Sequence, residues 1–293
     1  MADFSYLARP SAEWTSFLQQ QSLPPTPNLT SNPDIKAIRR RINSQRFTVS
    51  SDELKAMGGH GVKTKTSMIV GEDCVEIPIR LYVPGNHGAS VLLYFHGGGF
   101  FSGSLSTEDS TCTSLALNCG VTVVSVGYRL APEWTTPAPF QDAWDAHCWV
   151  IQNASGIGMP RKFSLYVIGI GASACLAASI VIRERMVSTT WASPSSRANA
   201  WPLPDKFPYE QVQDGKASPM QCQNAALLSY SWVVQYARMM DPPESCRDSP
   251  IINPLLFDEK VIDTLPPTYI MVCGHDPLRD HGMLFKEKLQ HLG

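Results

Sequence analysis

The sequence lacks any apolar run of the ~20 residues that a membrane-spanning helix needs. Its first residues, MADFSYLARPSAEW, also lack the basic start, the continuous apolar stretch and the small-residue cleavage site of a secretory signal. We therefore expect no membrane span and a cytoplasmic location.

An excess of charge and paired cysteine motifs are also missing. The formal net charge is −2 and the isoelectric point is near 6.4, so no broad positive field is available to hold a nucleic acid. The eight cysteines are scattered, without a CxxC pair or the Cys/His spacing of a zinc site. We expect reduced thiols, no bound metal, no nucleic-acid partner and a small-molecule substrate or ligand, while the oligomeric state stays open.

What is present is the composition of one globular body. The 293 residues are 43% hydrophobic and 17% charged, which is ordinary for a large α/β domain with a sizeable core. No repeat and no internal boundary is visible, so we predict a single domain over residues 1–293. The stretch 188–218 is rich in Ser, Pro, Asn and Trp without a period, and we interpret it as a surface insertion.

Residues 1–48 are predicted to form a helical arm that packs over the body as part of a cap. Ser11 and Asp34 can each cap a helical turn that carries an apolar stripe. The stripes consist of Trp14, Phe17 and Leu18 in the first helix, and Ile35, Ile38 and Ile42 in the second. The basic run 39–41 lies on the polar side of the second helix and is interpreted as a solvated face rather than a binding patch.

Strand patterns dominate the rest of the chain. Over residues 75–83 apolar and polar residues alternate, which predicts an antiparallel edge strand with one buried face. Later apolar runs are short and continuous, at 91–95, 121–126, 165–168, 225–228 and 269–272. Continuous runs separated by helical stretches indicate strands buried on both faces of a mostly parallel sheet flanked by helices.

A glycine-rich motif, HGGGF at residues 96–100, directly follows one of these strands. Three glycines allow the backbone to approach a substrate closely and to turn successive N–H groups toward one point, as a developing oxyanion requires. A flexible turn is the alternative interpretation of a lone GGG. Preceded by a strand and a histidine, the motif favours the functional interpretation.

Two further motifs, YRLAPE at 128–133 and DPLRD at 276–280, complete a pattern that resembles the hormone-sensitive-lipase-like esterases of the α/β-hydrolase fold, from about residue 75 to the end. The resemblance implies that Gly97, Gly98 and Ala172 supply oxyanion N–H groups. It also implies that Asp276 stands where the family's acid orients the catalytic histidine. A helix cap is the structural alternative for Asp276. In such motifs His96 is a structural hydrogen-bonding residue without a role in proton transfer.

The sequence departs from the family at the nucleophile elbow. The family pattern Gly-Asp-Ser-Ala-Gly-Gly exposes a serine on the turn between the fifth strand and its helix. Aligning Gly169 and the following helix start places Gly171 where that serine stands, and glycine offers no nucleophile. A shift of two residues makes Ser173 a substitute nucleophile but puts Cys175 where a glycine is favoured. The stretch also fits GxGxxA, yet no acidic residue follows at the spacing of a dinucleotide site, so we expect no cofactor.

A second departure concerns the catalytic histidine. In the family it lies on a loop after one more strand, beyond the helix that here spans about 282–292. We therefore expect the last strand and helix of the fold to be missing. His275, His281 and His291 all precede that loop, and we predict His281 and His291 to be surface residues of the helix.

The resemblance thus predicts an esterase-family protein that acts on a small ester, lactone or other carbonyl metabolite in a secondary-metabolite pathway, with standard Ser/His/Asp hydrolysis impaired. The alternative is a non-hydrolytic pocket protein. It would be a cyclase or isomerase that uses the oxyanion hole, or a small-molecule receptor.

Overall fold

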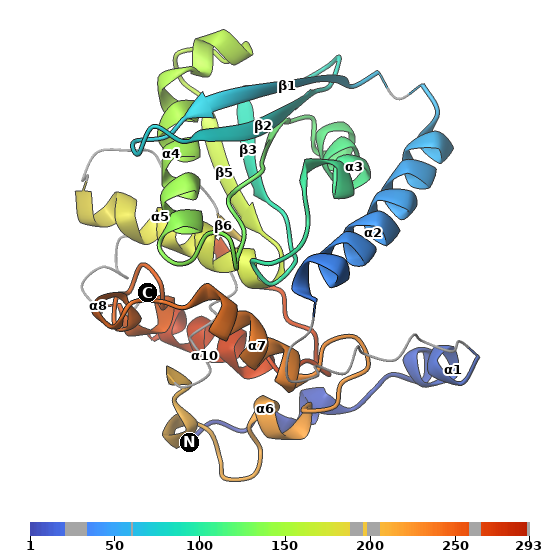
Figure 1. Ribbon diagram of the computed structural model, residues 1–293, viewed down its shortest axis with the longest axis vertical. Helices are drawn as coiled ribbons and strands as arrows, with labels where there is room; N and C mark the ends of the chain where they lie inside the picture. The colour runs from blue at the N-terminus through green and yellow to red at the C-terminus, as the bar shows by residue number, and fades with distance from the viewer. Residues whose placement is uncertain (21–33, 60, 188–195, 198–205, 258–264, 292–293) are drawn as a thin grey trace.

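The computed structural model describes residues 1–20, 34–59, 61–187, 196–197, 206–257 and 265–291. Over these residues the chain forms one mixed sheet flanked by helices (Figure 1). The order of the strands across the sheet is β1-β2-β4-β3-β5-β6-β7. The strands are β1 (Lys63–Val70), β2 (Glu76–Val83), β3 (Ser90–Phe95), β4 (Thr122–Val126), β5 (Ser164–Gly169), β6 (Ser196–Arg197) and β7 (Thr268–Tyr269).

The sheet is parallel from β4 through β3 and β5 to β7, and antiparallel where β1 and β2 join it. The alternating segment 75–83 forms β2, so its antiparallel orientation is confirmed. Its predicted position at the edge is wrong, because β1 pairs with it along all eight residues. Most β1 side chains are exposed, and its first five residues, 63–67, are all polar, so the sequence did not indicate a strand here.

The continuous apolar runs at the centre of the sheet are confirmed as strands buried on both faces. All residues of β4 are buried. On β3, Leu93 belongs to a core that includes Phe140 and Leu176, whereas its neighbour Tyr94 belongs to a second core with Ala116. Successive side chains of a strand point to opposite faces, so helices must cover both sides.

Helices pack on both faces of the sheet. Figure 1 shows α4 and α5 together on one face of the sheet and α3 on the other. The described helices of more than three residues are α1 (Ala12–Gln20), α2 (Ile35–Met57), α3 (Asp109–Cys119), α4 (Ala138–Gln152), α5 (Ala174–Val187), α6 (Ser218–Gln221), α7 (Tyr230–Met240), α8 (Glu244–Arg247) and α10 (Arg279–Gln290), apart from short 3-10 turns. None of them is long and apolar enough to cross a lipid bilayer.

Both caps predicted in the N-terminal arm are confirmed. The Ser11 hydroxyl accepts a hydrogen bond from the Trp14 N–H at 3.1 Å, and the Asp34 carboxylate accepts one from the Ala37 N–H at 2.9 Å. Helix α2 continues to Met57, past the boundary expected at residue 48. The arm therefore includes a long helix that lies against α3 (Figure 1) and against the 3-10 turn Leu105–Thr107.

Three expectations for the second half of the chain differ from the structure. Residues 225–228 were predicted as a strand, but they connect α6 to α7, and the Leu227 side chain is 73% exposed. The place beside β5 is taken by β6, which belongs to the stretch 188–218 interpreted as a surface insertion. Residues 188–195 and 198–205 of that stretch lie outside the described residues. The run 269–272 contributes only Tyr269 to β7.

Candidate active site

The loop after β3 folds back on itself through its glycines. The φ angles are +140° at Gly98 and +65° at Gly99, a region that glycine adopts without strain. The Gly98 carbonyl oxygen accepts hydrogen bonds from the N–H groups of Ser102 at 2.9 Å and Phe101 at 3.1 Å. A Cβ atom at residue 98 would lie 2.0 Å from the Ser102 carbonyl oxygen. This turn therefore requires glycine, and its hydrogen bonds hold it in one conformation.

The same turn leaves two main-chain donors available. Within the described part of the chain, the N–H groups of Gly97 and Gly98 donate no hydrogen bond to another residue. Gly97 is buried and Gly98 is partly exposed. Because backbone donors in folded proteins are almost always paired, two adjacent unpaired N–H groups favour a site for a ligand oxygen.

A second sharp turn, the elbow of residues 169–173, joins β5 to α5. A Cβ atom at Gly169 would lie 2.2 Å from the Ser173 carbonyl oxygen, so strand and helix approach each other as closely as the backbone allows. Gly171 lies at the exposed tip with a φ of +61°, and no atom lies within 4 Å of the position that its Cβ would take. Ile170, just before the tip, has its carbonyl oxygen 3.0 Å from the Cβ position of Gly97. The elbow and the glycine loop are therefore in contact.

The side chain of Ser173, the last residue of this turn, points into the protein interior and is fully buried. The hydroxyl donates a hydrogen bond to the Phe95 carbonyl oxygen at 2.8 Å and accepts one from the Ile170 N–H at 2.9 Å. The oxygen that sequence reasoning offered as a substitute nucleophile thus ties β3 to the elbow and does not face solvent.

Replacing Ser173 with alanine is expected to lower the free energy of unfolding by about 1–3 kcal/mol, because the Ile170 N–H and the Phe95 carbonyl would lose the hydroxyl and keep only the 3.3 Å hydrogen bond between them. Urea denaturation followed by circular dichroism measures this loss. A variant as stable as the wild type would contradict the buried position of the hydroxyl.

Asp276 lies in the turn between β7 and α10. Its carboxylate accepts a hydrogen bond from the Leu278 N–H at 2.7 Å, which closes a local turn. The N-cap of α10 is Leu278, which makes no side-chain cap hydrogen bond, so Asp276 is not the cap of this helix. Burial raises the pKa of the Asp276 carboxyl, and the Leu278 N–H offsets this rise in part. The carboxyl lines a cavity of about 370 Å³ together with Trp14 and Leu228. Among the described residues, no hydrogen bond or ion pair joins Asp276 to Gly171 or to the glycine loop.

The three C-terminal histidines have different surroundings. His275 is exposed and its Nδ1 lies 3.2 Å from the Ala8 carbonyl oxygen. His291 is exposed at the end of α10, as predicted. The same prediction for His281 is wrong: its side chain is 1% exposed, and its ring centroid lies 4.5 Å from that of Phe207. Burial lowers the pKa of His281 to about 3, and neither ring nitrogen has a hydrogen-bond partner among the described residues.

His96 is also buried, at the start of the glycine loop. Its ring stacks on Tyr128 with centroids 4.4 Å apart, and its Nδ1 lies 3.2 Å from the Gly97 carbonyl oxygen. Burial lowers the pKa of His96 to about 4, so the imidazole is neutral near pH 7. These contacts agree with the structural role expected for it.

The chain as a whole has counterparts among known proteins. Residues 92–293 match the family described by the alpha/beta hydrolase fold. The chain belongs to this α/β-hydrolase family. The resemblance to its esterases, first based on the three sequence motifs, is confirmed by the relatives.

Two curated relatives, both named as ester hydrolases, match this α/β hydrolase over most of their own length. Esterase LipI of Mycobacterium tuberculosis is 34% identical over 269 residues, which cover 90% of this chain and 78% of LipI. An ethyl acetate hydrolase of Pseudomonas putida is 27% identical over 288 residues, covering 89% of this chain and 86% of the relative.

Solved structures agree with the fold of this α/β hydrolase. An esterase of Pyrobaculum calidifontis matches with a TM-score of 0.79 at 26% identity, covering 97% of this chain and 86% of that one. Vibralactone cyclase matches with a TM-score of 0.84 at 23% identity, covering 98% and 84% of the two chains. At that identity the second likeness shows the fold alone.

The basic run 39–41 on α2 was expected to face solvent throughout, but one of its three side chains does not. Arg39 donates a hydrogen bond to the Phe101 carbonyl oxygen at 2.6 Å and forms an ion pair with Glu133 at 2.7 Å. Arg40 and Arg41 are exposed. The expectation is therefore wrong for Arg39, which joins α2 to Phe101, the residue after the HGGGF motif, and to the YRLAPE segment.

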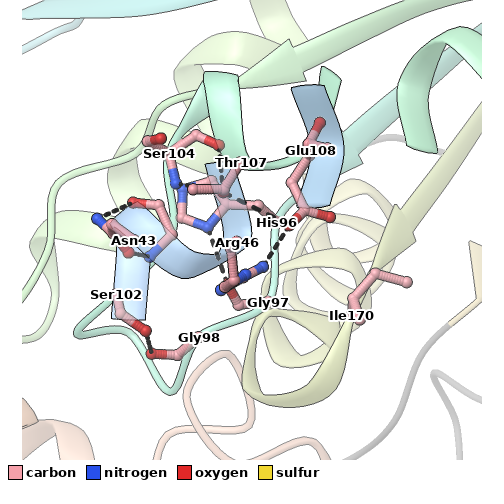
Figure 2. Close-up of polar contacts among 12 residues, drawn as sticks. Asn43, Arg46, His96, Gly97, Gly98, Ser102, Ser104, Thr107, Glu108 and Ile170 are labelled. Atoms are coloured by element: carbon pink, nitrogen blue, oxygen red, sulfur yellow. Dashed lines mark hydrogen bonds and ion pairs between the residues drawn. The ribbon is translucent and has the colours of Figure 1, made fainter. Parts of the chain in front are cut away.

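Two more side chains of α2 reach the glycine loop, and sequence reasoning missed both. The Asn43 amide oxygen accepts a hydrogen bond from the Gly103 N–H at 2.7 Å, and Arg46 donates one to the Gly97 carbonyl oxygen at 2.9 Å (Figure 2). Residues 39, 43 and 46 are spaced so that they share one helix face. That spacing is the signal in the sequence that could have found them.

Proposed function

We propose that this protein binds a small ester, lactone or other carbonyl compound at the glycine loop. The N–H groups of Gly97, Gly98 and Ala172 would surround the carbonyl oxygen, where negative charge develops in acyl chemistry. We further propose that Gly171 occupies the nucleophile position and that standard Ser/His/Asp hydrolysis is impaired. The observation that carries this proposal is the exposed, positive-φ tip at Gly171, which has room for a side chain and bears none.

The neighbours of Gly171 support its assignment to the nucleophile position. A nucleophile elbow is a sharp, strained turn directly between a strand and a helix. Gly171 is two residues beyond the last residue of β5, and α5 begins at Ala174. The oxyanion donors must lie beside the tip, and Gly97 contacts Ile170. The names of the relatives, an esterase and an ethyl acetate hydrolase, support an ester or a similar carbonyl compound as the ligand.

The alternative function uses the same pocket without hydrolysis. Oxyanion donors can stabilise enolate-like charge in a cyclisation or isomerisation that needs no nucleophilic side chain, and a receptor needs only affinity. The missing side chain at Gly171 favours this alternative as much as it favours impaired hydrolysis. Binding of a carbonyl ligand without its consumption, followed by calorimetry and product analysis, would support a receptor.

We expect almost no hydrolysis of short-chain p-nitrophenyl esters by the wild-type protein. Removing the triad from a serine hydrolase reduces turnover by about a million-fold. The variant Gly171→Ser should gain less than about tenfold, because a serine without a general base is a weak nucleophile. Initial rates of nitrophenolate release, corrected for the uncatalysed reaction, measure both.

Ser173→Ala is the matched control, and its rate should equal that of the wild type. Wild-type turnover that disappears in Ser173→Ala, while circular dichroism shows that the variant is folded, would show that Ser173 is the nucleophile. Robust turnover by Gly171→Ser would show that a histidine does reach the elbow, and the account of impaired hydrolysis would then be wrong.

A further inference from the structure

The orientation of one peptide group decides whether the Gly98 N–H faces a ligand. The Gly97 carbonyl and the Gly98 N–H belong to the same planar unit, and in a trans peptide they point in opposite directions. Arg46 donates to the Gly97 oxygen at 2.9 Å, and the His96 Nδ1 lies 3.2 Å from the same oxygen. Holding the oxygen toward α2 therefore points the Gly98 N–H away from α2.

The Arg46 guanidinium is itself held in place. Its second terminal nitrogen forms an ion pair with Glu108, which is only 7% exposed. The other carboxylate oxygen of Glu108 accepts a hydrogen bond from the Tyr94 hydroxyl at 2.6 Å. Figure 2 shows Arg46 between Gly97 and Glu108. A buried carboxylate on the α3 side thus fixes a cation that α2 supplies.

The positive charge of Arg46 also makes the Gly98 N–H a stronger hydrogen-bond donor. A cation that hydrogen-bonds to a carbonyl oxygen polarises the peptide, and hydrogen bonds in such a chain strengthen one another. A charge-assisted bond is stronger than a neutral one. The Gly98 N–H, at the other end of the same peptide, becomes a better donor to a negatively charged oxygen.

We propose that Arg46 is a positioning residue for the oxyanion site. It fixes the Gly97–Gly98 peptide with its N–H toward the ligand and makes that N–H favour an anionic oxygen over a neutral group. This inference rests on the proposed function, because it assumes that the ligand's oxygen binds at the glycine loop. It adds to that function a residue from the N-terminal arm, about fifty positions away from the loop.

The test compares an anion with a neutral molecule of similar shape. We expect 4-nitrophenolate, at a pH where it is ionised, to bind the wild type more tightly than 4-nitrotoluene does in isothermal titration. Arg46→Met should weaken binding of the anion by about tenfold, as the loss of a charge-assisted hydrogen bond does, and change binding of 4-nitrotoluene by less than about twofold. Arg40→Met, an exposed arginine on the same helix, is the matched control and should leave both affinities unchanged.

Hydrogen–deuterium exchange of the peptides that cover residues 96–103 gives a readout without any ligand. Exchange should be faster in Arg46→Met than in Arg40→Met. If the methionine variant does not fold, Arg46→Lys carries the test, because one ammonium group cannot reproduce the two-armed contact with Gly97 and Glu108. The lysine variant should lose several-fold of the anion affinity and keep that for 4-nitrotoluene.

The outcomes separate the inference from the proposed function. An anion preference in the wild type that survives in Arg46→Met, or unchanged exchange over 96–103, overturns the role of Arg46 alone. A wild type without any anion preference overturns the oxyanion site, and the role of Arg46 with it. Equal losses for both probes would show that Arg46 only stabilises the pocket, and the inference would again be wrong.

Discussion

The variant Gly169→Ala is expected to lose about 3 kcal/mol or more of its unfolding free energy, or to give no folded protein, because overpacking a tight site forces the backbone to move. The new Cβ would lie 2.2 Å from the Ser173 carbonyl oxygen and 2.5 Å from the Ala174 nitrogen. Both are backbone atoms, and the Ser173 hydroxyl holds this segment to β3 through the Phe95 carbonyl. Urea denaturation followed by circular dichroism measures the loss.

Gly171→Ala, two residues away, is the matched control. It introduces the same methyl group where no atom lies within 4 Å, so only the positive φ of +61° opposes it. A left-handed conformation costs a residue with a Cβ about 1–2 kcal/mol. Comparing the loss of unfolding free energy in Gly169→Ala with that in Gly171→Ala therefore tests whether strand and helix meet closely at Gly169. Equal losses, or a fully stable Gly169→Ala variant, would mean that strand and helix do not meet as described.

The sequence predicted the elements whose pattern follows from their surroundings. Strands β3, β4 and β5 are buried on both faces, so most of their residues are apolar. Each of the two N-cap side chains accepts a hydrogen bond from an N–H three residues later in the chain. Strand β1 could not be found in this way. It begins Lys-Thr-Lys-Thr and is mostly exposed, and it is a strand because β2 offers it a partner.

In the candidate site, too, some features could be predicted from the sequence and others could not. The glycine loop and the elbow were predictable because glycine is required where a Cβ would collide with backbone, as at Gly98. The contact of Arg46 with Gly97 was not predictable, because it joins residues 51 positions apart and depends on how α2 lies across the loop. Burial of His281 was missed for a similar reason. The helix face that carries it is covered by Phe207, from a segment whose position in the fold the sequence did not indicate.

Acidification below pH 6.5 is expected to destabilise the folded protein steeply. Burial lowers the pKa of His96 to about 4 and that of His281 to about 3, from the ordinary value of 6.5. Between those values the unfolded chain binds protons that the folded chain does not, so the unfolding free energy falls as the pH falls. Each histidine contributes a loss of up to about 1.4 kcal/mol per pH unit. The loss of unfolding free energy that is due to His96 is complete near pH 4, and the loss that is due to His281 is complete near pH 3. Well above pH 6.5 neither histidine makes the unfolding free energy depend on pH.

The variant His281→Phe measures the pH-dependent loss of stability that is due to His281 alone. The ring nitrogens of His281 have no partner among the described residues and its ring packs on Phe207, so phenylalanine should be tolerated at neutral pH. Urea unfolding at a series of pH values should then show a slope below pH 6.5 that is shallower by about 1.4 kcal/mol per pH unit. His291→Phe, at an exposed position, should leave the wild-type slope unchanged. An unaltered slope in His281→Phe would mean that this imidazole is protonated as readily in the folded chain as in the unfolded one, which its burial beside Phe207 does not allow.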